Sequence, residues 1–283
     1  MSKGFSIMEG SFGRFRTHTL LNNETGESAT TVDDFAAQLQ SLRFRGPDNK
    51  ITEVIMSHAS PEMMCELPTL AGAAPLIPFA NYITQGRYTF KGKEYELETK
   101  VRRGSTRIAI HGFLTDKAWK LEETGIANDE ASVTYGYIIG ENDFKGYPFC
   151  LNLKHRLELS ETFTSCVTAQ NNGVDPLPLA MGFHPYLRVS STDGKKIDGW
   201  ELTMPSSRMM VRDSDNPVNF VAQEFRGTQF DFTKPRLIGS TTFSDRLWLF
   251  RAGERTMARL LNPEAGFGID LWLGRGYEYV LLY

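Results

Sequence analysis

The chain has 283 residues, of which 41% are apolar and 12% aromatic, so a large core is possible and disorder is not expected. The net charge of −3 does not favour a nucleic-acid partner, because such proteins usually carry a basic face. No apolar run reaches the about 20 residues that cross a bilayer, and residues 1–10 lack the pattern of a secretory signal. We therefore expect a cytoplasmic protein without a membrane partner.

Short strand-like runs separated by turn signals dominate the chain. The exception comes first, because Phe35, Leu39 and Leu42 have helical spacing within Val32–Leu42. The predicted strands that follow are Arg87–Phe90, Glu94–Glu98, Ser132–Ile139, Phe149–Leu159, Phe163–Gln170, Trp200–Met204 and Leu247–Arg251. The first two flank Lys91-Gly92-Lys93 and predict a hairpin. With no linker or repeat, we predict one all-β domain spanning residues 1–283.

Three histidines lie on or beside predicted strands. His111 follows the apolar run Ile108–Ile110 and precedes Gly112, so it either faces a cleft or occupies a turn. His155 falls on the apolar side of the alternating segment "FCLNLKHRLELS", where a structural role is favoured over a catalytic one.

His184 lies in "MGFHPYL". Pro185 favours an extended backbone at His184, and Gly182 permits close approach of another segment. Its aromatic neighbours would exclude water and lower the pKa of the imidazole. A proton shuttle and a packed core histidine are both open on this evidence.

Polar side chains in "NYITQGRYTF" suit a hydroxyl-rich ligand. They are Asn81, Gln85 and Arg87, and Tyr186 would offer an aromatic face to a sugar. Phe79 and Trp119 are better explained by packing. Among the acids, Asp245 in "FSDRLWLF" precedes a predicted strand, and Asp231 is a rival.

The three cysteines, Cys65, Cys150 and Cys166, have no metal-type spacing. One interpretation places Cys150 and Cys166 on neighbouring strands. The favoured interpretation is that the cysteines are free, buried thiols of a protein in a reducing compartment. We find no nucleotide or metal-binding motif, so no cofactor and no metal are expected.

Five segments together are similar to the aldose 1-epimerase (galactose mutarotase-like) family, from about residue 20 to the last residue. In chain order they are "ETGESATTVDDFAAQLQSLRF", "AGAAPLIPFANYITQGRYTFKGKEYEL", "AIHGFLTDKAW", "LPLAMGFHPYL" and "FSDRLWLF". The resemblance implies a β-supersandwich of large antiparallel sheets, with strand, turn and strand over Val32–Phe44. It also implies a sugar substrate that is interconverted between its α and β anomers without a cofactor.

The resemblance assigns roles to particular residues. His184 would protonate the ring oxygen, and His111 would support the ring-oxygen side and bind the substrate. Asp245 is placed as the residue that fixes sugar hydroxyls. Such a reaction needs one acid and one base across the sugar, each able to reverse its role.

Two departures accompany the resemblance. Tyr82 stands where the family usually has an arginine that binds sugar hydroxyls. The family's base is a glutamate after the final strand, whereas this chain stops at Tyr283, so we expect it to lack its C-terminal strands and leave the base unassigned.

These departures keep other functions open: a non-catalytic carbohydrate-binding protein on the same scaffold, or another all-β carbohydrate enzyme such as a lyase. A phosphorylated sugar would call for a basic pocket, for which Arg87, Arg102, Arg103 and Arg188 are available. Neither sequence nor resemblance chooses between a monomer and a homodimer.

Overall fold

The structure is a computed structural model that describes residues 4–99, 101–127, 129–189, 197–213, 219–243, 246–250 and 256–282. It divides into two compact units, residues 1–188 and 189–283. Within the described ranges no helix is long and apolar enough to span a membrane. A single domain over the whole chain stays a prediction.

The first unit contains a large antiparallel sheet with the strand order β1-β2-β3-β4-β6-β16, and β5 pairs with β4. Its strands are β1 (Phe5–Phe12), β2 (Phe15–Asn22), β3 (Ser28–Val32), β4 (Gln38–Arg45), β5 (Ile51–Glu53), β6 (Ala73–Leu76) and β16 (Gly182–Pro185). Residues distant in sequence therefore meet at one edge, where β16 joins β6.

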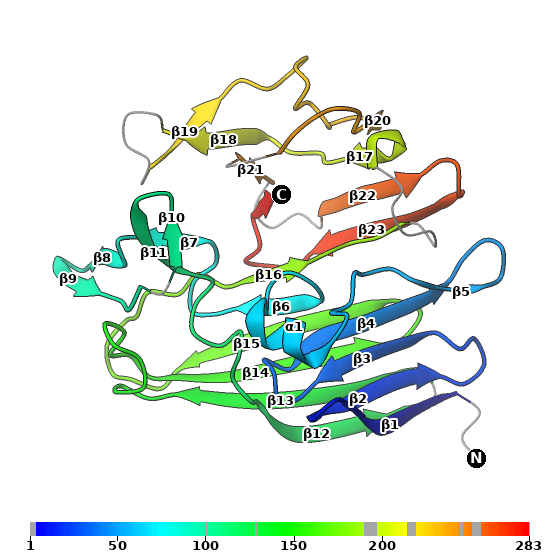
Figure 1. The fold of residues 1–283 in the computed structure, drawn as a ribbon, viewed down its shortest axis with the longest axis horizontal. Coiled ribbons are helices and arrows are strands. Elements are labelled where there is room, and N and C mark those ends of the chain that lie inside the picture. The colour runs from blue at the N-terminus through cyan, green and yellow to red at the C-terminus, as the bar shows by residue number, and fades with distance from the viewer. Residues whose placement is uncertain are drawn as a thin grey trace. The chain divides into compact units, whose positions relative to one another are not determined.

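A second antiparallel sheet of the first unit packs on β1 and β2 (Figure 1). It has the order β12-β13-β14-β15. Its strands are β12 (Lys120–Ile126), β13 (Ala131–Ile139), β14 (Leu151–Leu159) and β15 (Phe163–Asn171). In β14 the odd-numbered residues, His155 included, are all buried, which confirms the alternation predicted for this strand.

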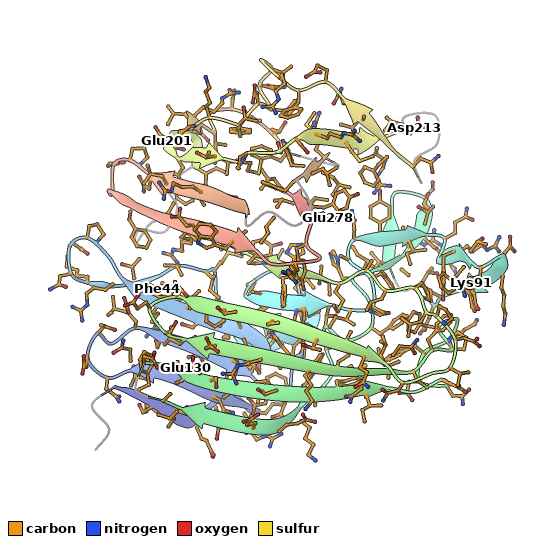
Figure 2. The ribbon with its side chains drawn as sticks, turned by 180° about the vertical axis from the view of Figure 1, so that it is seen from behind. Phe44, Lys91, Glu130, Glu201, Asp213 and Glu278 are labelled. Atoms are coloured by element: carbon orange, nitrogen blue, oxygen red, sulfur yellow. The ribbon has the colours of Figure 1, made fainter. Side chains whose placement is uncertain are left out.

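The remaining strands of the first unit are short. They form a sheet of β7 (Tyr82–Thr84), β10 (Val101–Arg103) and β11 (Thr106–Ile110), and a hairpin of β8 (Arg87–Phe90) and β9 (Lys93–Glu96). The hairpin was predicted, and Lys91 marks its turn in Figure 2. Tyr88 and Tyr95, which face each other across it, stack with ring centroids 5.0 Å apart.

The helical spacing of Val32–Leu42 does not produce a helix. β3 ends at Val32, a turn follows in which Ala36 and Ala37 have positive φ, and β4 begins at Gln38. Phe35, Leu39 and Leu42 are all buried, the first from the turn and the others from β4. Strand, turn and strand are therefore confirmed. The α-helix that does occur among the described residues is the short α1 (Pro61–Glu66), which the sequence did not predict.

The second unit has two antiparallel sheets, with the orders β20-β17-β22-β23 and β19-β18-β21-β24. Its elements are η1 (Ile197–Gly199), β17 (Glu201–Thr203), β18 (Arg208–Arg212), β19 (Phe220–Gln223), β20 (Arg236–Leu237), β21 (Arg246–Leu249), β22 (Thr256–Asn262), β23 (Phe267–Leu273) and β24 (Tyr279–Leu281). Trp248, Phe232 and Met204 are buried in its core. The strands predicted at Trp200–Met204 and Leu247–Arg251 correspond to β17 and β21.

The cysteines are free, as expected, but the expectation that they are buried is wrong. Cys65 and Cys166 are exposed and Cys150 is half-buried. Cys166 occupies an outward position of β15 and faces Arg156, whereas Cys150 precedes β14, so the two are not cross-strand neighbours. Cys166 is exposed because successive side chains of β15 point to opposite sides of the sheet, and Cys166 lies on the outer side.

A buried polar network joins the two larger sheets of the first unit. The Tyr135 hydroxyl donates to Asp33 Oδ1 at 2.7 Å and lies 2.7 Å from Thr31 Oγ1, and His18 Nδ1 lies 2.9 Å from Asp33 Oδ2. Burial, and then the charge of Asp33, raise the pKa of Tyr135. Removing one side chain from such a network lowers the stability of the protein, because a buried polar group then loses its hydrogen-bond partner.

We expect Tyr135→Phe to lower the free energy of unfolding by about 1.5–3 kcal/mol, because Asp33 loses a donor to a charged acceptor. The matched control is Tyr137→Phe on the same strand, whose hydroxyl has no hydrogen bond within the described residues. The control should change the free energy by less than about 0.5 kcal/mol. Urea unfolding measures both free energies, provided that their dependence on urea concentration has the same slope in the two variants. Equal unfolding midpoints for Tyr135→Phe and Tyr137→Phe would contradict the prediction.

Candidate functional site

His184 is held in an extended strand. In β16, His184 pairs with Ala74 and Gly182 pairs with Leu76 of β6. A Cβ atom at Gly182 would lie 2.8 Å from the Ala80 side chain, so the close approach expected at this glycine is observed. The extended backbone expected before Pro185 is also observed.

His111 lies at the exit of β11, as predicted, and its backbone is unusual. Its φ is +60°, a left-handed conformation that is uncommon for residues other than glycine. Gly112 follows with φ +74°, and a side chain there would overlap the carbonyl oxygen of Ile77. Backbone strain of this kind clusters at functional sites, where the surrounding structure holds it.

The backbone between β6 and β7 brings the two histidines together. On one side it bonds to the His111 segment, through Phe113 N–H to Ile77 O at 2.8 Å and His111 N–H to Asn81 O at 2.8 Å. On the other side Leu76 pairs with Gly182, and Ala80 N–H donates to Ala180 O at 2.9 Å. Sequence reasoning missed this role of residues 76–81, although Gly112 and Gly182 signalled that another backbone approaches.

The two imidazoles contact each other edge to face. The His111 and His184 ring centroids are 5.2 Å apart, with an angle of 79° between the ring planes. Tyr186 also stacks on His184, with ring centroids 5.2 Å apart and an angle of 23° between the ring planes. Both histidines are half-buried, so each retains access to solvent.

Desolvation dominates the electrostatics of the pair. Burial, and then the neighbouring His184, lower the pKa of His111 to about 4. Burial also lowers the pKa of His184, partly opposed by a hydrogen bond with its own backbone. Near neutral pH the pair is therefore mostly uncharged, and each neutral ring offers one N–H donor and one nitrogen acceptor.

His111 Nδ1 is buried without a hydrogen-bond partner in the described structure. Buried polar atoms are nearly always paired, so an orphan of this kind is expected to have a partner that a ligand or water supplies. Two half-buried neutral imidazoles in contact form an arrangement that can donate to and accept from a polar ligand.

The other predicted site residues have different positions. Asn81 is half-buried with φ +59°, and its carbonyl oxygen accepts a hydrogen bond from the His111 N–H. The adjacent Tyr82 lies in β7, where it pairs with Ile110 of β11. Arg87 instead belongs to the β8–β9 hairpin, with Nε 3.7 Å from Glu96 Oε2. Asp245 lies outside the described residues.

Several residues have structural roles. His155 is fully buried, bonds Ser165 Oγ at 2.8 Å through Nε2, and has a pKa lowered by burial to about 3. Phe79 and Trp119 are buried, as packing predicted. The Asp231 carboxylate accepts from Thr233 and Gly227 in a turn.

Comparison with known proteins extends these observations. Residues 18–272 match the family model for aldose 1-epimerase. An uncharacterized protein of Escherichia coli K12, YihR, is 27% identical over 219 residues, covering 76% of this chain. The matched part makes up 64% of that relative, so the chain spans somewhat less than two thirds of its length.

Solved structures resemble the whole chain. A galactose mutarotase-like protein from Clostridium acetobutylicum has a TM-score of 0.80 at 17% identity, covering 98% of this chain and 83% of that one. Galactose 1-epimerase from Lactobacillus acidophilus NCFM has a TM-score of 0.66 at 18% identity, covering 98% and 93%. These likenesses confirm the all-β, galactose mutarotase-like supersandwich as the fold.

Gly112→Ala should destabilise the protein by about 1–3 kcal/mol more than Gly92→Ala, because overpacking in a closed site has that cost. Gly92 is a matched control, since its φ of +76° is similar but no atom lies within 4 Å of the place that an added methyl group would take. Urea unfolding of both variants measures the difference. Equal losses would show that Ile77 yields to the added methyl group.

The His111 ring should stay neutral down to about pH 5. Its folded pKa of about 4 lies below the ordinary 6.5, so the unfolded chain binds a proton that the folded form does not. Stability from this residue is full above pH 6.5 and decreases as the pH falls toward 4. NMR titration of the imidazole Cε1–H, assigned with His111→Asn, measures this; a midpoint above pH 6 would contradict it.

Proposed function

Because the chain belongs to the aldose 1-epimerase family, we propose that it interconverts the α and β anomers of a free hexose or hexose derivative by acid/base ring opening. The observation that carries the proposal is the contact between His111 and His184, which lie 73 residues apart in sequence and meet with ring centroids 5.2 Å apart. Neither a cofactor nor a metal is part of this mechanism.

The reaction needs two proton transfers. A base removes the proton of the anomeric hydroxyl while an acid gives a proton to the ring oxygen, and the bond between C1 and the ring oxygen breaks. Rotation about C1–C2 and the reverse transfers close the ring on the other face. We assign the acid to His184 and substrate support to His111, whose ring contacts that of His184.

The lowered pKa of His184 has two opposing effects on this role. Its protonated form gives up a proton readily, but that form is less populated near neutral pH. The neutral ring still donates an N–H hydrogen bond to an oxygen on which charge develops. We assign no residue to the base, for which the family uses a glutamate after its final strand.

Other residues of the proposal hold the sugar. Asn81 and Tyr186 adjoin the histidines, and Tyr82 neighbours Asn81 in the strand that pairs with β11. Asp245 and Arg87 remain predictions as hydroxyl-binding residues. A cytoplasmic location, and a monomer or homodimer, likewise remain predictions.

A second candidate function is carbohydrate binding without catalysis. Tyr82, in place of the arginine usual in the family, motivates it, because a phenol lacks the planar charged fork that holds two hydroxyl oxygens at once. This function predicts sugar binding without anomeric exchange, and binding that is indifferent to a neutral replacement of His184.

His184→Asn should slow exchange by roughly 10²-fold or more, since a positioned general acid contributes at least that much. The measurement is NMR exchange with fresh α-glucose, α-galactose and glucose 6-phosphate. His58→Asn is the control, because His58 is also a buried histidine with a lowered pKa but bonds Gln40 and Leu67 instead.

The outcomes separate the two functions. A loss below about threefold in folded His184→Asn would remove the acid assignment, since general acid catalysis contributes far more. Sugar binding by the unmodified protein without any exchange would favour the non-catalytic function. Unfolding midpoints and sugar affinity of each variant exclude misfolding as the cause.

A further inference from the structure

A basic hollow lies in the first unit, at the end of β7 and β11 opposite to His111. Its volume is about 530 Å³. Arg87, Arg102 and Arg107 line it together with one acidic residue, Glu96, so basic residues outnumber acidic ones in the lining. The chain as a whole is acidic, with a net charge of −3, so this concentration of arginines is not a general property of its surface.

Two of the arginines stand directly opposite each other. Arg102 of β10 pairs with Arg107 of β11 in the antiparallel register. Residues in such a position have Cβ atoms about 4.5–5.5 Å apart, and like charges there are unfavourable. An anion between the two guanidinium groups would convert this repulsion into attraction.

The described structure supplies little countercharge to them. Neither Arg102 nor Arg107 has an ion pair or a side-chain hydrogen bond with a described residue, and both are exposed. Glu96 lies 3.7 Å from Arg87, long for a hydrogen-bonded pair, and is itself exposed. Their donors are therefore available to a ligand.

Hydrogen-bonding groups and a fixed backbone complete the hollow. Thr99, Ser105 and Thr106, which carry hydroxyl groups, are also among its lining residues. Gln85 N–H donates to Arg107 O at 2.8 Å, so the end of β7 is bonded to the strand that carries Arg107. Guanidinium forks and hydroxyls suit the several oxygens of a tetrahedral anion.

We propose that this hollow binds the phosphate or sulfate group of a small molecule, as a second ligand site separate from the histidine pair. Arg107 precedes His111 by four residues, about 13 Å along an extended strand at about 3.3 Å per residue. An anion on Arg102 and Arg107 is thus displaced from the imidazoles. The inference goes beyond the proposed function and does not rest on it.

Calorimetric titration of the full chain with inorganic phosphate, with sulfate and with glucose 6-phosphate tests the site. We expect saturable binding of all three, weakened tenfold or more in Arg107→Ala and in Arg102→Ala. Arg275→Ala is the matched control, because Arg275 is an exposed arginine of the second unit. Binding that is unsaturable, or equal in the variants and the control, would overturn the proposal.

A second measurement guards against misfolding. Without phosphate, the unfolding midpoint of Arg107→Ala at low salt should equal or exceed that of the unmodified protein, because a like-charge contact is relieved. Phosphate should raise the midpoint of the unmodified protein but not that of the variant. A variant already less stable without phosphate would contradict the like-charge argument.

Titration of the His184→Asn variant with phosphate and with glucose 6-phosphate tests whether the hollow and the histidine pair are separate sites. Unchanged phosphate and glucose 6-phosphate affinities in this variant would support a separate site. A tenfold loss for glucose 6-phosphate alone would place that ligand's sugar on the histidines and overturn the separation. Neither result depends on whether the protein exchanges anomers.

Discussion

The backbone of residues 76–81 is the constraint on which the candidate site depends, because hydrogen-bonding partners occupy both of its sides. One side holds the exit of β11 and the other holds β16 and Ala180. Gly112 and Gly182 are necessary because each leaves room where this segment passes. With both sides engaged, His111 and His184 meet at a fixed distance, and the positive φ of His111 is held by the backbone around it.

β11 has very different electrostatic surroundings at its two ends. At its exit, two half-buried imidazoles have lowered pKa values, and desolvation is the main cause for both. At its start, charged guanidinium groups remain in contact with water and opposite each other. A polar, uncharged ligand suits the first environment and an anion suits the second, because desolvation penalises charge only where water is excluded.

Local patterns are enough to predict the secondary structure where apolar and polar residues alternate strongly. In β14, apolar residues at every second position predict one buried face that includes His155, and these residues are buried. The β8–β9 hairpin followed from its glycine turn. The two-residue turn of Gly104 and Ser105 also contained a signal that was missed, since it places Arg102 opposite Arg107. The placements of His111 after a strand and of His184 in an extended one were local and were predicted correctly.

Which of these local features meet depends on long-range packing. Phe35, Leu39 and Leu42 have helical spacing, but pairing of β4 with its neighbours stabilises strand, turn and strand instead, because burial in a sheet outweighs local propensity. At the site, Arg87 of the β8–β9 hairpin lines the basic hollow, and its contact with a sugar stays a prediction. Local sequence sets the direction of the side chains along a strand. The contact between His111 and His184 depends instead on residues 76–81, whose hydrogen bonds to both segments no local pattern specifies.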